Sequence, residues 1–126
     1  MLLKKYADSD FFLALLKDSD WLKERAIKIY SENKDNIYVT PFTVAELMLI
    51  CVRKEIPLRK TLLHVSRIAF LAFVKWDLFF QAVDYIEQGV SVFDALLMAF
   101  VKENEIISSD KIYAKFGFKV IDLKKS

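Results

Sequence analysis

KYADSDFFLALL, residues 5–16, joins a short strand-like approach, an acidic turn and an apolar helical run. Asp8 and Asp10 stand where the strand should end and the helix should begin. Two interpretations are open at this point. In the first, Asp8 caps the new helix and Asp10 is favourable charge in its first turn. In the second, the two acids form one corner of an acidic site. The rest of the sequence bears on that choice.

The same order of strand and helix recurs along the chain. Strand-like segments lie at residues 4–7, 37–39, around 73–76, 105–108 and 118–123. Helical patterns lie at residues 11–17, 21–32, 42–54, 58–70, 77–88, 91–104 and 110–116, with a turn at 18–20. This alternation predicts an α/β fold, a parallel sheet with helices on both faces. Ligands of such sheets collect at the carboxyl ends of the strands, which is where Asp8 and Asp110 fall.

Composition limits the class of protein. With 126 residues, 55% of them hydrophobic, and only two glycines and two prolines, the chain is expected to form one domain over residues 1–126. The longest apolar run, residues 68–74, is too short to cross a bilayer, and the first residues lack the order of a secretory signal. Cys51 is the only cysteine, which fits a reducing cytoplasm. So much apolar residue in a short chain predicts that another chain covers part of the surface.

Several acids have a structural explanation beside the functional one. Asp8 and Asp110 each precede a helical pattern and fit the position of an N-cap. Ser91 and Asp94 have the spacing of a capping box, which is worth about 1 kcal/mol. Taken singly, each of these acids is explained by helix capping.

Glu46 is harder to explain in that way. From residue 42 to residue 52 the helix is apolar except at Thr43 and Glu46, so it is expected to be buried on nearly all sides. A solvent-facing stripe through those two positions would continue to position 50, which is Ile50. A buried carboxylate without a cation costs several kcal/mol or takes up a proton. Glu46 therefore needs a compensating partner.

Asp94 has a similar setting, because residues 95–101 continue its helix without a polar residue. Two acids at strand ends and two on buried helices form the oxygen-rich set that Mg²⁺ or Mn²⁺ prefers. No cluster of histidine and cysteine points to zinc: His64 is expected at the surface or a helix contact, and Cys51 in the core. If four of the 17 acids share one pocket, 19 lysines and arginines face the remaining 13 (17 less 4), and that surface would attract a polyanion.

Four segments, in order, resemble the PIN-domain nucleases: YADSDFFLALL, TPFTVAELML, SVFDALLMAF and IISSDKIYAKFGFKVIDL. The resemblance runs from Lys4 to Leu123. It is closest to the small stand-alone type, such as the VapC toxins of VapBC toxin–antitoxin pairs, in an archaeal style. It implies a PIN-like three-layer α/β/α sandwich with a five-stranded parallel sheet in the order 3-2-1-4-5.

The resemblance also implies the functional residues. The family's acidic positions fall on residues that would be catalytic and would hold the metal: Asp8, Glu46, Asp94 and Asp110. The family's late hydroxyl falls on Ser108, which would be a catalytic-site residue that orients a carboxylate or a water. Asp10 departs from the family, which more often has an uncharged residue there, so the electrostatics of this pocket differ from the family pattern.

The implied activity is hydrolysis of phosphodiester bonds in single-stranded RNA by an endoribonuclease that depends on Mg²⁺ or Mn²⁺. The implied partners are a second copy of the chain, in a homodimer, and a cognate antitoxin; no membrane is involved. Basic residues between positions 53 and 67 would guide the RNA backbone, contact a partner, or simply form a solvated helix face: Arg53, Lys54, Arg59, Lys60 and Arg67.

Three alternatives remain open at this stage. The chain is an RNA-processing PIN nuclease outside any toxin pair, or a PIN-like interaction module without catalysis. A third alternative is a phosphoacceptor receiver domain, with Asp77 and Ser108 in its pattern. The receiver leaves Glu46 and Asp94 unexplained on buried helices, which ranks it last.

Overall fold

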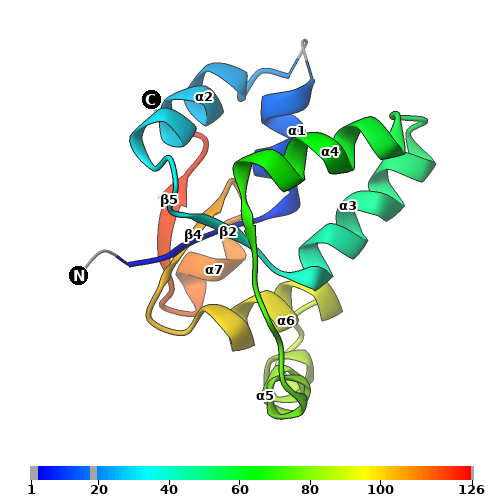
Figure 1. Cartoon of the computed structure of the whole chain (residues 1–126). Coiled ribbons are helices and arrows are strands. Elements are labelled where there is room, and N and C mark those ends of the chain that lie inside the picture. Colours follow the sequence, from blue (N-terminus) through cyan, green and yellow to red (C-terminus); the bar gives the residue numbers. More distant parts are fainter. Residues whose placement is uncertain (1–2, 18–19, 126) are drawn as a thin grey trace.

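The computed structural model describes residues 3–17 and 20–125, which form a parallel sheet with helices on both faces (Figure 1). The strands are β1 (Lys5–Ala7), β2 (Ile37–Val39), β3 (Phe70–Leu71), β4 (Glu105–Ser108) and β5 (Lys119–Asp122). The helices are α1 (Ser9–Leu16), α2 (Lys23–Glu32), α3 (Pro41–Arg53), α4 (Leu58–Ile68), α5 (Trp76–Glu87), α6 (Val92–Val101) and α7 (Ile112–Lys115). Most of the turn expected at 18–20 lies outside the described residues.

The sheet order is β3-β2-β1-β4-β5, with every neighbouring pair parallel, which confirms the expected architecture. This order is also incompatible with a receiver domain, whose doubly wound sheet runs 2-1-3-4-5. Asp77 lies in the first turn of α5 and not at the end of a strand. The receiver alternative is therefore wrong.

β1 lies in the middle of the sheet, with its side chains buried on both faces. Tyr6 pairs with Tyr38 of β2 and Ile106 of β4, while Ala7 pairs with Ile107. Successive strand residues point to opposite faces. Tyr6 and Ile106 accordingly belong to the core shared with α5, α6 and α7, and Ala7 and Ile107 to the core shared with α1 to α4. The strand thus ends, at Asp8, between two packed layers.

The strand expected around residues 73–76 is wrong. β3 consists only of Phe70 and Leu71, and α5 already begins at Trp76. The strand pairs with the last two residues of β2, Tyr38 and Val39. An edge strand needs only one partner, so its position is set by where β2 ends. The evenly apolar run at 68–74 contains no signal for that position.

The burial expected for α3 is wrong as well. Leu47 and Cys51 do lie in the core, but Leu49 and Val52 are exposed, Val52 by 67%. The helix therefore has an apolar face toward solvent, which hydrophobicity alone does not distinguish from a buried face. No helix among the described residues is both long enough and apolar enough to cross a membrane.

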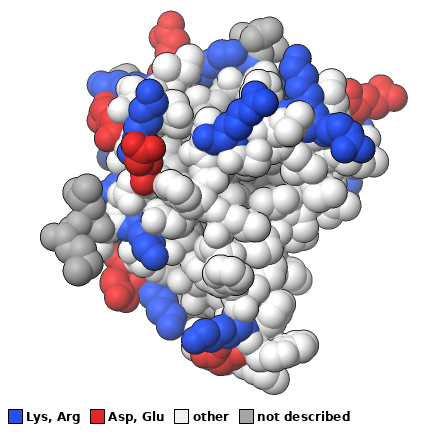
Figure 2. All heavy atoms as spheres, viewed as in Figure 1, with Lys and Arg blue, Asp and Glu red and all other residues white. Residues whose placement is uncertain are grey.

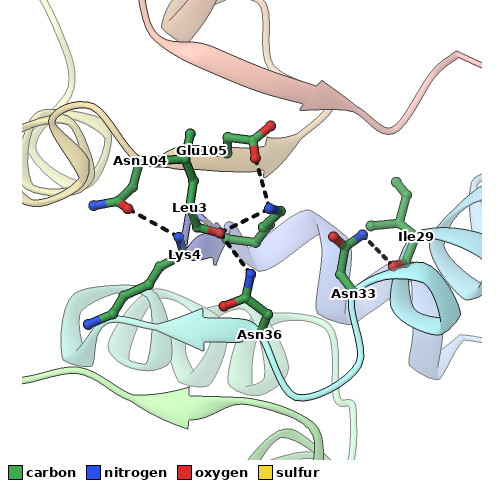
Figure 3. Close-up of polar contacts among 8 residues, drawn as sticks. Leu3, Lys4, Ile29, Asn33, Asn36, Asn104 and Glu105 are labelled. Carbon is green, nitrogen blue, oxygen red and sulfur yellow. Dashed lines mark hydrogen bonds and ion pairs between the residues drawn. The ribbon is translucent and has the colours of Figure 1, made fainter. Parts of the chain in front are cut away.

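A polar network fixes the start of β1 at the amino edge of the sheet, away from the strand ends that face the acids (Figure 3). Lys5 Nζ contacts Glu105 Oε1 at 2.9 Å and donates to the carbonyl of Leu3 at 2.9 Å. Asn36 Nδ2 donates to the same carbonyl at 2.7 Å, and Asn104 Oδ1 accepts from the backbone N–H of Lys4 at 3.1 Å. The network ties β1 to both neighbours, β2 and β4.

Replacing Glu105 with alanine should lower the free energy of unfolding by about 1–3 kcal/mol, because the largely buried ammonium of Lys5 loses its counter-charge. Urea unfolding measures this as a lower midpoint at an unchanged m-value. Glu103→Ala, in the exposed turn before β4, is the matched control and should leave the midpoint in place. Equal shifts in the two variants would show that the pair contributes nothing specific.

Candidate active site

A hollow of about 600 Å³ opens at the carboxyl ends of β1 and β4. It is lined by Asp8, Ser9, Asp10, Glu46, Ser91, Asp94, Ser109, Asp110, Lys111 and Lys124. The structure thus brings together the four acids that the sequence singled out and adds Asp10 as a fifth. Ser108 lies behind Asp8 and does not line the hollow itself.

Asp8 serves as a helix cap and as part of this hollow at once. Its Oδ1 accepts a hydrogen bond from the backbone N–H of Ser9 at 2.8 Å, which caps α1. Its Oδ2 accepts from Ser108 Oγ at 3.2 Å, and Ser108 Oγ accepts from the N–H of Asp110 at 3.0 Å. Asp8 is only 8% exposed. The two interpretations that the sequence left open at Asp8 are therefore compatible.

Tyr113 joins two of the acids and was missed in the sequence. Its hydroxyl lies 2.9 Å from Asp8 Oδ2 and 2.9 Å from Asp94 Oδ1, and the residue is fully buried. A phenol has one proton to donate, so it serves one carboxylate at a time while both are ionised. A buried tyrosine hydroxyl needs a polar partner, so a tyrosine in a short helix that packs on the sheet was the signal that could have indicated this contact.

Asp94 and Asp110 differ in whether the helix cap expected at each position forms. Ser91 makes no side-chain cap to the backbone of α6; its Oγ instead donates to Asp94 Oδ2 at 2.9 Å. The capping box suggested by the spacing is thus replaced by a contact that holds the Asp94 side chain. Asp110 Oδ1 accepts from the N–H of Ile112 at 3.0 Å, as a cap would, while its residue stays exposed at the rim.

Glu46 reaches the hollow from α3, where its Oε1 accepts from Ser9 Oγ at 2.7 Å. Glu46 thus lies where the sequence predicted an acidic site, although the helix around it is not buried on all sides. Asp10 completes the set: its Oδ2 accepts from both the N–H of Ser109, at 2.9 Å, and the hydroxyl of Ser109. Its Oδ1 is buried and has no hydrogen-bond partner among the described residues.

The electrostatics of the hollow disfavour ionised acids. Burial, with the charges of Asp10 and Glu46, raises the pKa of Asp8 from 3.8 to about 7. Burial also raises the pKa of Asp10 and of Glu46, and the carboxylate of Asp94 adds to the effect on Glu46. No ion pair between described residues includes any of the five acids. The two lysines that line the hollow, Lys111 and Lys124, therefore do not neutralise any of the acids by direct contact.

The residues fit a divalent cation by their chemistry. All of the acids offer hard oxygen donors, and Asp10 Oδ1 has no hydrogen-bond partner among the described residues. A bound cation would offset the burial and the mutual repulsion that raise the pKa values of Asp8, Asp10 and Glu46. Within residues 3–17 and 20–125, no three acid, histidine or cysteine side chains stand close enough to hold an ion as they are. The carboxylates are instead turned toward hydroxyls and backbone N–H groups, so binding requires their side chains to rotate.

Without divalent cations, stability should depend on pH through Asp8. Its folded pKa of about 7 lies above the unfolded value of 3.8, so the folded chain binds the extra proton. The free energy of unfolding should then fall as pH rises between those two values, by an amount on the order of a few kcal/mol. Urea unfolding in EDTA across this range measures the slope.

Asp8→Asn should remove most of that fall, because the amide does not titrate. Asp84→Asn, on the exposed face of α5, is the control and should keep the wild-type slope. A wild-type stability that is constant or rises over this pH range contradicts the prediction.

A family model for the PIN domain matches residues 5–119. A search of curated proteins finds no significant match. Among solved structures, the chain is similar to VapC20 of Mycobacterium tuberculosis, described as a sarcin–ricin loop cleaving toxin. The TM-score is 0.76 at 16% identity, over 91% of this chain and 96% of that one.

Two toxin–antitoxin assemblies are similar as well. A complex from Klebsiella pneumoniae has a TM-score of 0.76 at 13% identity, over 98% of this chain and 100% of that one. VapBC2 from Rickettsia felis, bound to a promoter DNA fragment, has a TM-score of 0.65 at 11% identity, over 95% and 98%. These low identities establish the fold alone. The acids of this chain meet at the carboxyl edge of a sheet in the order 3-2-1-4-5. The PIN-domain model matches most of the chain, and the chain therefore belongs to the PIN domain family.

Proposed function

We propose that this protein is an endoribonuclease that cleaves single-stranded RNA with the help of Mg²⁺ or Mn²⁺, and that it acts as the toxin of a toxin–antitoxin pair. One observation carries the proposal: five carboxylates share one hollow without a cationic partner, at the strand ends of a PIN-family sheet. The similarity to VapC20 and to toxin–antitoxin complexes supports the RNA substrate and the antitoxin.

In this proposal Asp8, Glu46, Asp94 and Asp110 hold the ion or ions. When bound, such an ion supplies a water of lowered pKa and neutralises charge that develops on the phosphate. Ser108 and Tyr113 hold the Asp8 carboxylate in place, and Ser9 does the same for Glu46. These hydroxyls set the resting direction of the carboxylate oxygens, from which the side chains rotate when an ion binds.

The two lysines at the hollow have a separate task. Lys111 and Lys124 line its exposed side and bring positive charge beside an otherwise acidic site. A phosphate group that approaches five carboxylates is repelled until cations balance them. The lysines supply part of that balance and are placed to contact phosphate groups of the substrate.

Purified protein should cut single-stranded RNA with Mg²⁺ or Mn²⁺, and EDTA should stop the reaction. Asp94→Asn should reduce cleavage by at least about 100-fold, because one oxygen ligand and its charge are lost. Its circular dichroism spectrum should match that of the wild type. Asp84→Asn is the control: it removes the same single negative charge, but at a residue outside the hollow.

The same two variants give a readout that does not depend on cleavage. Millimolar Mn²⁺ should raise the melting temperature of the wild type and of Asp84→Asn, and raise that of Asp94→Asn much less. Cleavage that persists in full in EDTA overturns the metal requirement. A Mn²⁺ shift without cleavage of any RNA would favour the non-catalytic interaction module, and cleavage confined to a structured precursor would favour RNA processing.

The exposed apolar face supports a homodimer. Phe73, Trp76 and Phe80 are exposed by 96%, 80% and 73%. Few charged side chains lie over α3 and the segment that leads from α4 into α5, in the centre and lower right of Figure 2. A surface of this kind is usually covered in solution. We assign it to a second copy of the chain, in the symmetric arrangement that most small homodimers adopt.

Sedimentation at micromolar concentration should give about twice the chain mass of 14.7 kDa. Phe80→Glu places a charge on the apolar face and should shift the protein to a monomer with an unchanged fold. Ile27→Glu, a similar change on the exposed side of α2, is the control and should remain a dimer. A wild type that stays monomeric over the accessible concentrations rules the assignment out.

A further inference from the structure

A second hollow, of about 440 Å³, lies beside the acidic one, between the start of α2 and the chain that follows β5. It is lined by Trp21, Leu22, Glu24, Arg25, Lys28, Leu123, Lys124 and Lys125, and is called the α2 groove below. Lys124 lines both hollows, so the two are adjacent at the carboxyl edge of the sheet. A ligand in one hollow can therefore extend into the other.

The floor and backbone of the α2 groove are fixed by the fold. Leu123 is fully buried, and its N–H donates to the carbonyl of Ser108 at 3.2 Å, which ties the groove to the end of β4. Lys124 N–H donates to Asp122 Oδ1 at 2.8 Å, and Arg25 Nε donates to the carbonyl of Asp122 at 3.4 Å. The groove is therefore a built feature of the sheet edge.

The walls of the groove are basic. Arg25, Lys28, Lys124 and Lys125 line it, against one lining acid, Glu24. None of these four cations forms an ion pair with a described residue. These side chains are available for an anion from outside the chain.

Trp21 adds an aromatic surface to this charge. It is 76% exposed, although the next residue, Leu22, is buried. A tryptophan face beside unpaired cations is the combination by which proteins hold single-stranded nucleic acid: bases stack on the ring while phosphates follow the charges. A volume of about 440 Å³ falls within the range of pockets that hold small organic groups such as a nucleoside.

We propose that the α2 groove is the binding site for the RNA strand next to the bond that is cut, with one base stacked on Trp21 and phosphates along Arg25, Lys28, Lys124 and Lys125. The identity of the ligand rests on the proposed nuclease function. The location of the site rests on the groove itself. The strand passes from the groove to the acidic hollow past Lys124, which contacts a phosphate shared by the two.

The test uses binding in EDTA, where no cleavage occurs. The probe is a fluorescein-labelled oligouridine of about ten nucleotides. Trp21→Ala should weaken its binding about 5- to 100-fold by anisotropy, the loss expected for one stacked base. Leu63→Ala, which removes an exposed apolar side chain on α4, outside both hollows, should leave the affinity unchanged. In a Trp76→Phe protein, unlabelled oligouridine should quench the fluorescence of Trp21.

Salt dependence tests the charges separately. Lys28→Ala and Lys125→Ala should each reduce the slope of log affinity against log salt by about 0.7, as one lost phosphate contact does for single strands. Lys34→Ala, an exposed lysine in the turn between α2 and β2, is the control and should keep the slope.

The experiments distinguish an error in the groove proposal from an error in the nuclease proposal. Cleavage with normal binding in Trp21→Ala overturns the groove and leaves the nuclease standing. Binding and quenching without cleavage under any divalent ion supports the groove and overturns the nuclease. Quenching by poly-glutamate as strong as that by oligouridine overturns the assignment to RNA in favour of an acidic protein partner.

Discussion

The geometry of the acidic hollow depends on the pairing of β1 with β2 on one side and β4 on the other. The backbone N–H of Asp8 donates to the carbonyl of Ile107 at 3.0 Å, so the ladder extends to the first residue after the strand. That bond sets Asp8 beside Ser108 and starts α1 at the same point. A slip of one residue would move every side chain of β1 to the opposite face. Core packing on both faces of Tyr6 and Ala7 prevents the slip and thereby fixes the position of the acid.

The acids are held by neutral groups in place of cations. Ser9, Ser108, Ser109 and Tyr113 each donate a hydroxyl to one or more carboxylates of the hollow. Neutral donors fix the direction of a carboxylate without cancelling its charge, so burial and, after it, repulsion from Asp10 and Glu46 still raise the pKa of Asp8. A fold under selection for stability alone would replace some of these acids, because uncompensated buried charge is unfavourable. Their joint presence supports the proposed function, in which a cation completes the site.

Local signals predicted some elements well and others poorly. β2 and β4 lie at the expected residues, since short β-branched runs there are bounded by polar turns. β3 was misplaced because nothing in an evenly apolar segment marks where an edge strand meets its partner. Glu46 was identified through a burial argument that does not hold for α3 as a whole. Tyr113 was missed, because its contact with Asp8 spans residues far apart in sequence, and such contacts depend on the register of the sheet.

The single proton of Tyr113 makes the corner between Asp8 and Asp94 locally frustrated. Two arrangements exist, one with the hydroxyl directed at each carboxylate, and neither satisfies both acceptors. At any moment, either Asp8 Oδ2 or Asp94 Oδ1 therefore lacks the hydrogen bond from Tyr113. In the proposed metal site, an ion that took that oxygen would displace no hydrogen bond from Tyr113, and the hydroxyl would then be directed at the other acid. The buried phenol lets one carboxylate be released while its neighbour stays in place.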